Sequence, residues 1–195
     1  MNNPDQSFRR RIVVSAWIAM DGVFDADTMA DWFSPYDSAD RGAYIQNNVQ
    51  TSDAVLVGRV TYEMLAGYWP NQKHNESGIA DKLNSMPKYV VSSGLTEAGW
   101  NNSTIIRDDV THQVSRLKRQ PGQDIIVFGS ATLVEGLLVA GLVDELRFLV
   151  QPVLAGKGKR FFKEGMGVTG MSLVKTQAFS KGVVLLSYKP ETAEQ

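Results

Sequence analysis

The sequence predicts an α/β fold built on a mixed sheet that is parallel in its middle and antiparallel at its C-terminal edge. Short apolar runs rich in β-branched residues alternate with stretches of helical periodicity along the first two thirds of the chain. These runs are apolar at consecutive positions, which is typical of strands covered on both faces in a parallel sheet. Closer to the C-terminus, apolar runs follow one another without a strong helical pattern between them, which favours antiparallel neighbours.

The alternating part of the chain contains five predicted strands and five predicted helices. The apolar runs that predict strands are 11–20, 54–58, 88–92, 103–107 and 124–129. The helical patterns are 39–50, 59–68, 78–86, 110–120 and 132–141. Pro121-Gly122 predicts the end of the fourth helix. Thr132, with Glu135 three residues later, has the spacing of a capping box at the start of the fifth.

Three further strands are predicted at the C-terminal end, over 145–154, 171–179 and 182–189. The stretch "FSKGVV" between the last two is a turn signal, so these two strands are expected to form a hairpin.

Length and composition favour a single domain. The chain has 195 residues, 43% of them apolar, and a formal net charge of -1, so we place one domain at 11–189 with flexible tails at 1–8 and 190–195. The near-neutral charge argues against a nucleic-acid partner. No apolar run approaches the ~18 residues that a membrane helix needs, and no secretory signal is visible, so a cytoplasmic protein is expected. The absence of cysteine excludes disulfides, thiolate catalysis and zinc–thiolate sites.

Three predicted strands are followed by residues that suit phosphate. After the second strand come Gly58, Arg59 and Thr61, where a helix N-terminus offers free N–H groups and arginine adds a charged fork. The alternative is that Arg59 is an ordinary surface arginine and Thr61 a helix cap. Ser92 and Ser93 follow the third strand and suit a ribose or phosphate, although an ordinary polar turn has the same composition.

The third of these strand ends is the junction after 124–129. Gly129, Ser130, Ala131 and Thr132 form a glycine–small–helix junction that lets the backbone approach a pyrophosphate. The GxGxxG fingerprint is absent, because only one glycine is present.

These motifs, taken in order, resemble the dihydrofolate reductase-like superfamily. The residues that carry the resemblance are "SAWIAMDGVFD", "VLVGRVTYEML", "KYVVSS", "IIVFGSATLVEGLL" and "PVLAGKGKRFF". The chain looks most similar to the reductase domain of the bifunctional riboflavin-biosynthesis deaminase-reductase and to its single-domain relatives. The resemblance implies a three-layer fold on a mostly parallel eight-stranded sheet, and an NADPH-dependent reductase activity. It covers about residues 11–189.

The resemblance also assigns residues to the coenzyme and the substrate. It implies that the adenosine phosphates are held by Gly58, Arg59, Thr61, Ser92 and Ser93, and the pyrophosphate by Gly129, Ser130, Ala131, Thr132 and Leu133. The charge of Arg59 would then select the 2′-phosphate of NADP. The first strand and its loop would border the nicotinamide and the substrate, through Ala16, Trp17, Met20, Asp21 and Gly22.

One departure from the family pattern concerns the acid. Classical dihydrofolate reductases carry a carboxylate shortly before a Trp-Phe pair, and in "DTMADWF" that position is occupied by Met29. Asp27 and Asp31 lie two residues to either side. Asp21 and Asp31 are the candidate catalytic residues, with an exposed loop carboxylate as the alternative for Asp31 and a turn residue for Asp21.

The substrate side is predicted in "GKGKRFF". Lys157, Lys159 and Arg160 lie among glycines there and would suit a substrate phosphate, or would be a solvated basic loop. Lys159 and Arg160 are the candidates we retain. Trp17, Trp32 and Trp69 would wall an aromatic pocket or belong to the core. No residue spacing suggests a metal site.

The function predicted from the sequence is hydride transfer from NADPH to a small heterocyclic or carbonyl substrate, such as 5-amino-6-(5-phosphoribosylamino)uracil. Two alternatives stay open: a non-catalytic NADP(H)-binding or sensor protein, and a dihydrofolate-type reductase with a relocated acid. A purely structural dimeric module is a further option. A homodimer is expected, because the C-terminal strands offer an apolar surface.

Overall fold

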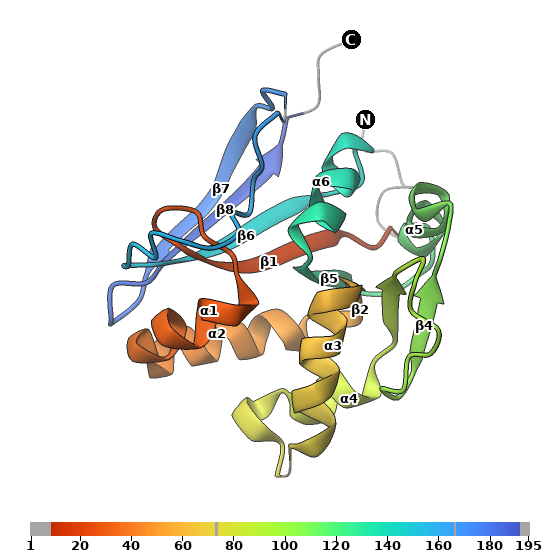
Figure 1. Cartoon of the computed structure of the whole chain (residues 1–195), viewed down its shortest axis with the longest axis horizontal. Coiled ribbons are helices and arrows are strands. Elements are labelled where there is room, and N and C mark those ends of the chain that lie inside the picture. Colours follow the sequence, from red (N-terminus) through yellow and green to blue (C-terminus); the bar gives the residue numbers. More distant parts are fainter. Residues whose placement is uncertain (1–8, 73, 166, 192–195) are drawn as a thin grey trace.

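The structure is a computed structural model that describes residues 9–72, 74–165 and 167–191. An eight-stranded sheet runs through its middle in the order β4-β3-β2-β5-β1-β6-β8-β7 (Figure 1). The strands are β1 (Ile12–Ala19), β2 (Ser52–Gly58), β3 (Lys88–Val91), β4 (Ser103–Ile106), β5 (Asp124–Gly129), β6 (Glu145–Gln151), β7 (Met171–Ala178) and β8 (Val184–Pro190).

Helices connect the strands as far as β6, except that β4 follows β3 without a helix between them. They are α1 (Ala26–Phe33), α2 (Ala39–Gln50), α3 (Arg59–Tyr68), α4 (Ala80–Ser85), α5 (Val110–Lys118) and α6 (Ala131–Val139). Three single-turn 3-10 helices connect them, at Ser34–Tyr36, Trp69–Asn71 and Glu76–Gly78. Within the described ranges, no helix has the length and apolar character needed to cross a bilayer.

The strand directions confirm the predicted mixed sheet. From β4 to β6, all neighbouring strands run parallel, and β8 pairs antiparallel with both β6 and β7. The last strand reaches Pro190, and the N–H of Glu191 donates to the carbonyl of Gly170 at 2.9 Å, so the ordered chain continues past the expected boundary at residue 189. The remaining tail residues, 1–8 and 192–195, lie outside the described residues.

Helices cover both faces of the sheet, which gives three layers (Figure 1). On one face, alternate β1 residues such as Ile12 and Val14 pack with apolar residues of α5 and α6. On the other face, Val55 and Val57 of β2 pack with apolar residues of α2, α3 and α4. Burial on both faces explains why the strand sequences are continuously apolar rather than alternating.

Two local predictions need correction. Residues 26–33 form α1, where no helix was predicted; its N-cap is Asp25, whose side chain accepts from the N–H of Asp27 at 3.4 Å. Helix α6 is capped by Ser130 and not by Thr132: the Ser130 hydroxyl accepts from the N–H of Leu133. Ser130 has the extended backbone typical of an N-cap, so the helix begins one residue before Thr132.

Lys88 of β3 is a fully buried cation in this core. Its ammonium group donates to the carbonyls of Asn84 and Asn101, both at 2.8 Å, and lies 4.4 Å from the centre of the Trp100 ring. Burial lowers the pKa of Lys88 to about 8, because removing the charged form from water is costly.

This lowered pKa predicts a pH dependence of stability. Between pH 8 and 10 the unfolded chain still binds the lysine proton while the folded chain releases it, so the free energy of unfolding should rise by about 2 kcal/mol. The rise should be absent from Lys88→Met. Urea unfolding of both proteins at several pH values tests this, and equal slopes in the two would contradict it. Measurements stop at pH 10 because burial also raises the pKa of Tyr44, to about 12, which lowers stability above pH 10.

Candidate active site

The three strand ends predicted to suit phosphate are neighbours in the sheet. The order β3-β2-β5 places the residues after Val91, Gly58 and Gly129 along one edge. Helices α3 and α6 begin directly after β2 and β5, so two helix N-termini, each carrying partial positive charge, meet at this edge.

Glycines allow these two helix starts to approach closely. A Cβ atom on Gly58 would lie 2.7 Å from the Ser130 hydroxyl oxygen and 3.2 Å from the Ser130 backbone nitrogen. A Cβ atom on Gly129 would lie 3.1 Å from the Thr61 hydroxyl and 3.0 Å from the Phe24 ring, and the φ of Gly129 is +131°. The peptide bond between Gly129 and Ser130 is cis. Larger residues would therefore push the two junctions apart.

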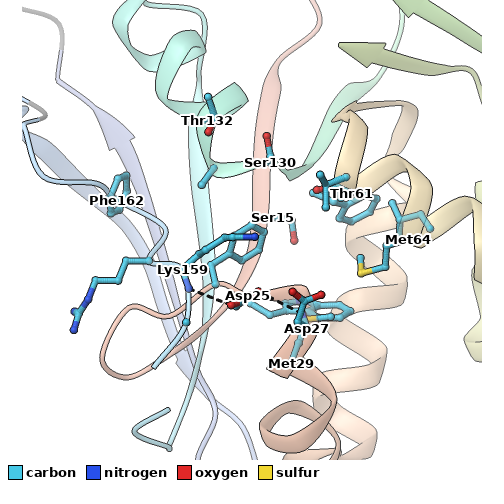
Figure 2. A pocket seen from close by; sticks show the side chains of 18 of the residues that line it. Ser15, Asp25, Asp27, Met29, Thr61, Met64, Ser130, Thr132, Lys159 and Phe162 are labelled. Atoms are coloured by element: carbon cyan, nitrogen blue, oxygen red, sulfur yellow. Dashed lines mark hydrogen bonds between the residues drawn. The ribbon is translucent and has the colours of Figure 1, made fainter. Parts of the chain in front are cut away.

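A cavity of about 840 Å³ opens beside this junction. Figure 2 shows side chains from five parts of the chain around one space: Ser15 from β1, Asp27 and Met29 from α1, Thr61 and Met64 from α3, Ser130 and Thr132 at the start of α6, and Lys159 and Phe162 from the loop after β6. The volume and the mixture of apolar walls with a few polar groups are typical of a small-molecule site.

The α6 end of the cavity offers donors and a cation. Ala131 and Thr132 line the cavity, and in the described chain their N–H groups have no acceptor. Lys163 lines the same region, with its ammonium group 3.0 Å from the Thr132 hydroxyl. Free N–H groups at a helix start together with a lysine form an anion-binding arrangement.

The loop after β1 holds the loop after β6 in place; this second loop, which carries Lys157, Lys159 and Arg160, is called the basic loop below. Phe24 donates its N–H to the carbonyl of Lys159 at 2.7 Å, and the carboxylate of Asp25 accepts from the N–H of Lys159 at 3.2 Å. Asp21 accepts from the N–H of Gly156 at 2.8 Å, and this bond is the main cause that lowers the pKa of Asp21. Asp21 therefore anchors the basic loop and does not line the cavity.

Lys159 and Arg160, the two basic residues selected from this loop as candidates for substrate binding, line the cavity. Arg160 donates to the backbone carbonyl of Asp21 at 2.7 Å. The ammonium group of Lys159 makes no hydrogen bond or ion pair with any described residue, so it is available to an anionic group of a ligand.

The carboxylates of α1 differ in position. Asp27 and Asp31 are both exposed. Asp27 and Met29 line the cavity, whereas Asp31, one turn further along α1, does not. The cavity therefore has a carboxylate at Asp27, two residues before the position where dihydrofolate reductases carry theirs.

An aromatic wall closes the side of the cavity near β1. Trp17 lines the cavity and stacks on Phe33 of α1, with ring centres 4.0 Å apart and an interplanar angle of 17°. Trp69 also lines the cavity, while Trp32 is buried. Ala16 and Trp17 are neighbours in a strand, so their side chains point to opposite faces; Ala16 packs in the core with α5 and α6, away from the cavity.

Of the residues predicted to hold the adenosine phosphates, Thr61 lines the cavity, whereas the others lie at the strand edge, outside the lining: Gly58, Arg59, Ser92 and Ser93. Arg59 is half exposed and pairs with Glu63, one turn along α3, at 2.9 Å. Ser92 is buried, and its hydroxyl accepts from the N–H of Leu95, while Ser93 is exposed. Arg107, after β4, donates to the carbonyls of Ser93 at 3.5 Å and Thr96 at 3.3 Å, so its guanidinium lies beside this turn.

The structure thus brings together part of the predicted set. The members that line the cavity are Trp17, Thr61, Ser130, Ala131, Thr132, Lys159 and Arg160. The members outside the lining are Ala16, Met20, Asp21, Gly22, Asp31, Gly58, Arg59, Ser92, Ser93, Gly129 and Leu133. Ser15, Asp27 and Lys163 line the cavity and were not selected from the sequence. In the described part of the chain, no three His, Cys, Asp or Glu side chains are grouped to hold a metal ion.

Comparison with known proteins decides the family. The profile of the RibD C-terminal domain matches residues 10–185. The chain belongs to the RibD C-terminal domain family. RibD C-terminal domain proteins and dihydrofolate reductases share the fold described above, so the resemblance inferred from the sequence is confirmed.

Individual relatives are similar over nearly their whole length. The uncharacterized protein YyaP of Bacillus subtilis (strain 168) is 30% identical over 183 residues, which cover 92% of this chain and 95% of YyaP. Among solved structures, a Shewanella sp. PV-4 protein assigned to riboflavin biosynthesis has a TM-score of 0.74 at 16% identity, covering 93% of this chain and 99% of its own. Dihydrofolate reductase from Enterococcus faecalis, complexed with NADP(H), has a TM-score of 0.61 at 16% identity, covering 95% and 99%. At these identities the two structures show the fold alone.

Proposed function

We propose that this RibD C-terminal domain protein is an NADPH-dependent reductase that transfers a hydride to a small heterocyclic substrate. The observation that carries the proposal is the convergence of the α3 and α6 N-termini at one edge of the sheet, directly beside a cavity of about 840 Å³. Two helix starts with unused N–H groups attract the phosphates of a dinucleotide, and the cavity has room for reacting rings.

The residues present fit the coenzyme. Ala131, Thr132 and Lys163 would hold the pyrophosphate, since they combine free N–H groups with a positive charge. Arg107, beside Ser93, and Arg59, at the end of the neighbouring strand β2, would hold the 2′-phosphate of the adenosine. For this, Arg59 exchanges an exposed ion pair with Glu63, a contact that contributes less than about 1 kcal/mol.

The chemistry divides between coenzyme and chain. NADPH, when bound, supplies the hydride. Trp17, which stacks on Phe33, gives the substrate ring a flat apolar surface, and Lys159 offers a cation to an anionic substituent such as a ribosyl phosphate. Three carboxylates line the cavity, those of Asp25, Asp27 and Glu164. Asp25 already accepts from the N–H of Lys159, so we assign Asp27 to hold an amino group of the substrate or a water that delivers the proton. A substrate of the 5-amino-6-(5-phosphoribosylamino)uracil type matches this combination.

A second candidate is favoured by the position of Asp27. A dihydrofolate-type reductase with a relocated acid needs a carboxylate at the ring-binding end of the cavity, and Asp27 provides one. Turnover of dihydrofolate that is lost in Asp27→Asn would support this candidate. Turnover of the ribosylaminopyrimidine alone would support the first.

The coenzyme part of the proposal is tested by Arg59→Ala. We expect the variant to bind NADPH more weakly by roughly 1–3 kcal/mol while NADH affinity is unchanged, because a charge-assisted contact to the 2′-phosphate is lost. Isothermal titration of both coenzymes measures the difference. The control is Arg119→Ala, which removes an exposed arginine at the end of α5. Equal losses for both coenzymes, or wild-type protein that binds neither, would contradict the proposal. Binding without oxidation of NADPH by any ring tested would favour the sensor protein.

A further inference from the structure

A line of buried polar side chains leads from the cavity into the space between α2 and the sheet. Ser15 of β1, Arg147 of β6 and Ser187 of β8 are register partners across three neighbouring strands. Asn48 of α2 and Glu145 of β6 join them, and the exposed fractions of Ser15, Asn48, Glu145 and Ser187 are between 2% and 6%. Groups so deeply buried are expected to have fixed hydrogen-bond partners.

The inner end of this line is fixed by an ion pair. The carboxylate of Glu145 accepts from Arg147 through both oxygens, at 2.8 Å from Nε and 2.9 Å from Nη2. It also accepts from the Ser187 hydroxyl at 2.6 Å. This two-point contact holds the Arg147 guanidinium in one orientation.

The orientation of Arg147 fixes that of Asn48. Arginine can only donate, and Nη1 of Arg147 donates to Oδ1 of Asn48. The amide oxygen of Asn48 therefore faces Arg147, and its NH₂ group faces Ser15, with Nδ2 2.9 Å from the Ser15 hydroxyl oxygen. The NH₂ group can only donate, so Ser15 must accept this bond.

The hydroxyl of Ser15 can then donate its proton to few acceptors. Among the described residues, the Ser15 hydroxyl makes no second hydrogen bond. Ser15 lines the cavity, and Figure 2 shows its side chain among the other lining residues. Its unused donor is therefore available only to a molecule that occupies the cavity.

We infer that Ser15 is a specificity-determining hydrogen-bond donor to an exocyclic oxo group of the bound ring, and that Asn48 and Arg147 are positioning residues that make it a donor. The inference rests on the proposed function in taking the cavity as the site of a heterocyclic substrate. It adds the class of substituent: a ring that presents an oxo group accepts the Ser15 proton, whereas one that presents an amino group uses the second lone pair of Ser15 and leaves the buried hydroxyl proton without an acceptor.

Asn48→Asp is the sharpest test, because it reverses the direction of the hydrogen bond at nearly constant shape. The new carboxylate accepts from Arg147 and also from Ser15, so the Ser15 proton turns away from the cavity and its lone pairs turn toward it. The positive charges of Arg147 and Arg11, which contacts Glu145 at 3.2 Å, balance the two carboxylates.

The probes are uracil and 2,4-diaminopyrimidine, titrated calorimetrically at a pH where both are uncharged. Wild-type protein should bind uracil more tightly than the diamine. Ser15→Ala should weaken the binding of uracil by about 3- to 10-fold with little effect on the binding of the diamine, as expected for the loss of one hydrogen bond. In Asn48→Asp the preference should shift toward the diamine by a similar factor. In the double variant Ser15→Ala/Asn48→Asp, the ratio of the two affinities should equal that of Ser15→Ala, because the effect passes through the hydroxyl.

Ser187→Ala is the matched control, because it removes a buried hydroxyl from the far end of the same line, and its affinity ratio should be that of wild type. An unchanged ratio in Ser15→Ala, a shift that persists in the double variant, or wild-type protein that binds neither ring would overturn the inference. If Asn48→Asp fails to fold, Ser15→Ala decides it alone.

These titrations need no turnover. If the protein fails to bind NADPH but Ser15→Ala still changes the ratio of the two affinities, the proposed reductase function is contradicted and the inference about Ser15 stands. NADPH binding together with an unchanged ratio of uracil to diamine affinity in Ser15→Ala would overturn the inference and leave the proposed reductase function.

Discussion

Replacing Arg41 by methionine is expected to lower the free energy of unfolding by about 1–3 kcal/mol, because it leaves a buried hydrogen-bond acceptor without its donor. The carboxylate of Asp37, the ion-pair partner of Arg41, is exposed and returns to water. The side chain of Arg41 is fully buried. Its guanidinium donates to the carboxylate of Asp37 at 2.7 Å, and to the carbonyl of Phe33 and the amide oxygen of Gln151, both at 3.2 Å. Methionine fills much of the volume but leaves the buried Gln151 without its donor.

The same substitution should weaken substrate binding more than coenzyme binding. The Arg41 guanidinium lies 4.1 Å from the centre of the Phe33 ring, and Phe33 stacks on Trp17 at the cavity wall. Loss of this cation–π contact frees Phe33 and Trp17 to move, whereas the α3 and α6 junctions do not contact Arg41 through any of its described hydrogen bonds.

Urea unfolding and calorimetric titration of Arg41→Met measure these two effects. Arg116→Met is the control, since Arg116 is an exposed residue of α5, and its change should stay within about 0.5 kcal/mol. A loss of stability in Arg41→Met no larger than in the control would show that the buried arginine contributes little.

Replacing Gly129 by alanine is expected to cost about 3 kcal/mol of stability and to weaken NADPH binding at least about tenfold. The φ of Gly129 is +131°, a conformation that residues with a side chain rarely adopt. The added methyl group would also meet the Phe24 ring at 3.0 Å and the Thr61 hydroxyl at 3.1 Å. Relief of these contacts moves the start of α6 away from α3, where the coenzyme phosphates are proposed to bind.

Gly136→Ala is the matched control for this prediction. Gly136 lies within α6, and a Cβ atom there would have no neighbour within 4 Å, so alanine should stabilise the helix by up to about 1 kcal/mol. Thermal unfolding and NADPH titration compare the two variants. If Gly129→Ala keeps wild-type NADPH affinity, the coenzyme phosphates do not bind at this junction.

Much of the fold was predictable because its signals are local. The apolar run 54–58 and the helical pattern 59–68 correspond to β2 and to α3 with little change. Parallel strands must end at the same edge, so the residues after β2, β3 and β5 could be expected near one another. Helix α1 was missed because its signal is short, with only eight residues and a cap at Asp25 that resembles a turn.

The candidate site was predicted less completely, because its other residues are recruited across the sheet. The alternation of a strand could have placed Ser15 beside Trp17 on the same face, but nothing local shows that α2 supplies Asn48 to it, 33 residues later in the sequence. The link from Lys163 to the start of α6 spans 31 residues, and it forms only when the basic loop folds back over the sheet. Asp31, selected for its charge, lies outside the cavity lining, one turn beyond Asp27 on α1.

The sequence by itself determined the order of elements, the mixed sheet and the edge at which α3 and α6 begin, since hydrophobic periodicity and the residues at strand ends are encoded within a few positions. Only the tertiary structure decided which polar groups became buried and in which direction they donate. Arg147 meets Asn48 across 99 residues, and Arg41 meets Gln151 across 110. Those contacts exist because packing leaves a buried donor no alternative partner, and packing is a property of the whole chain.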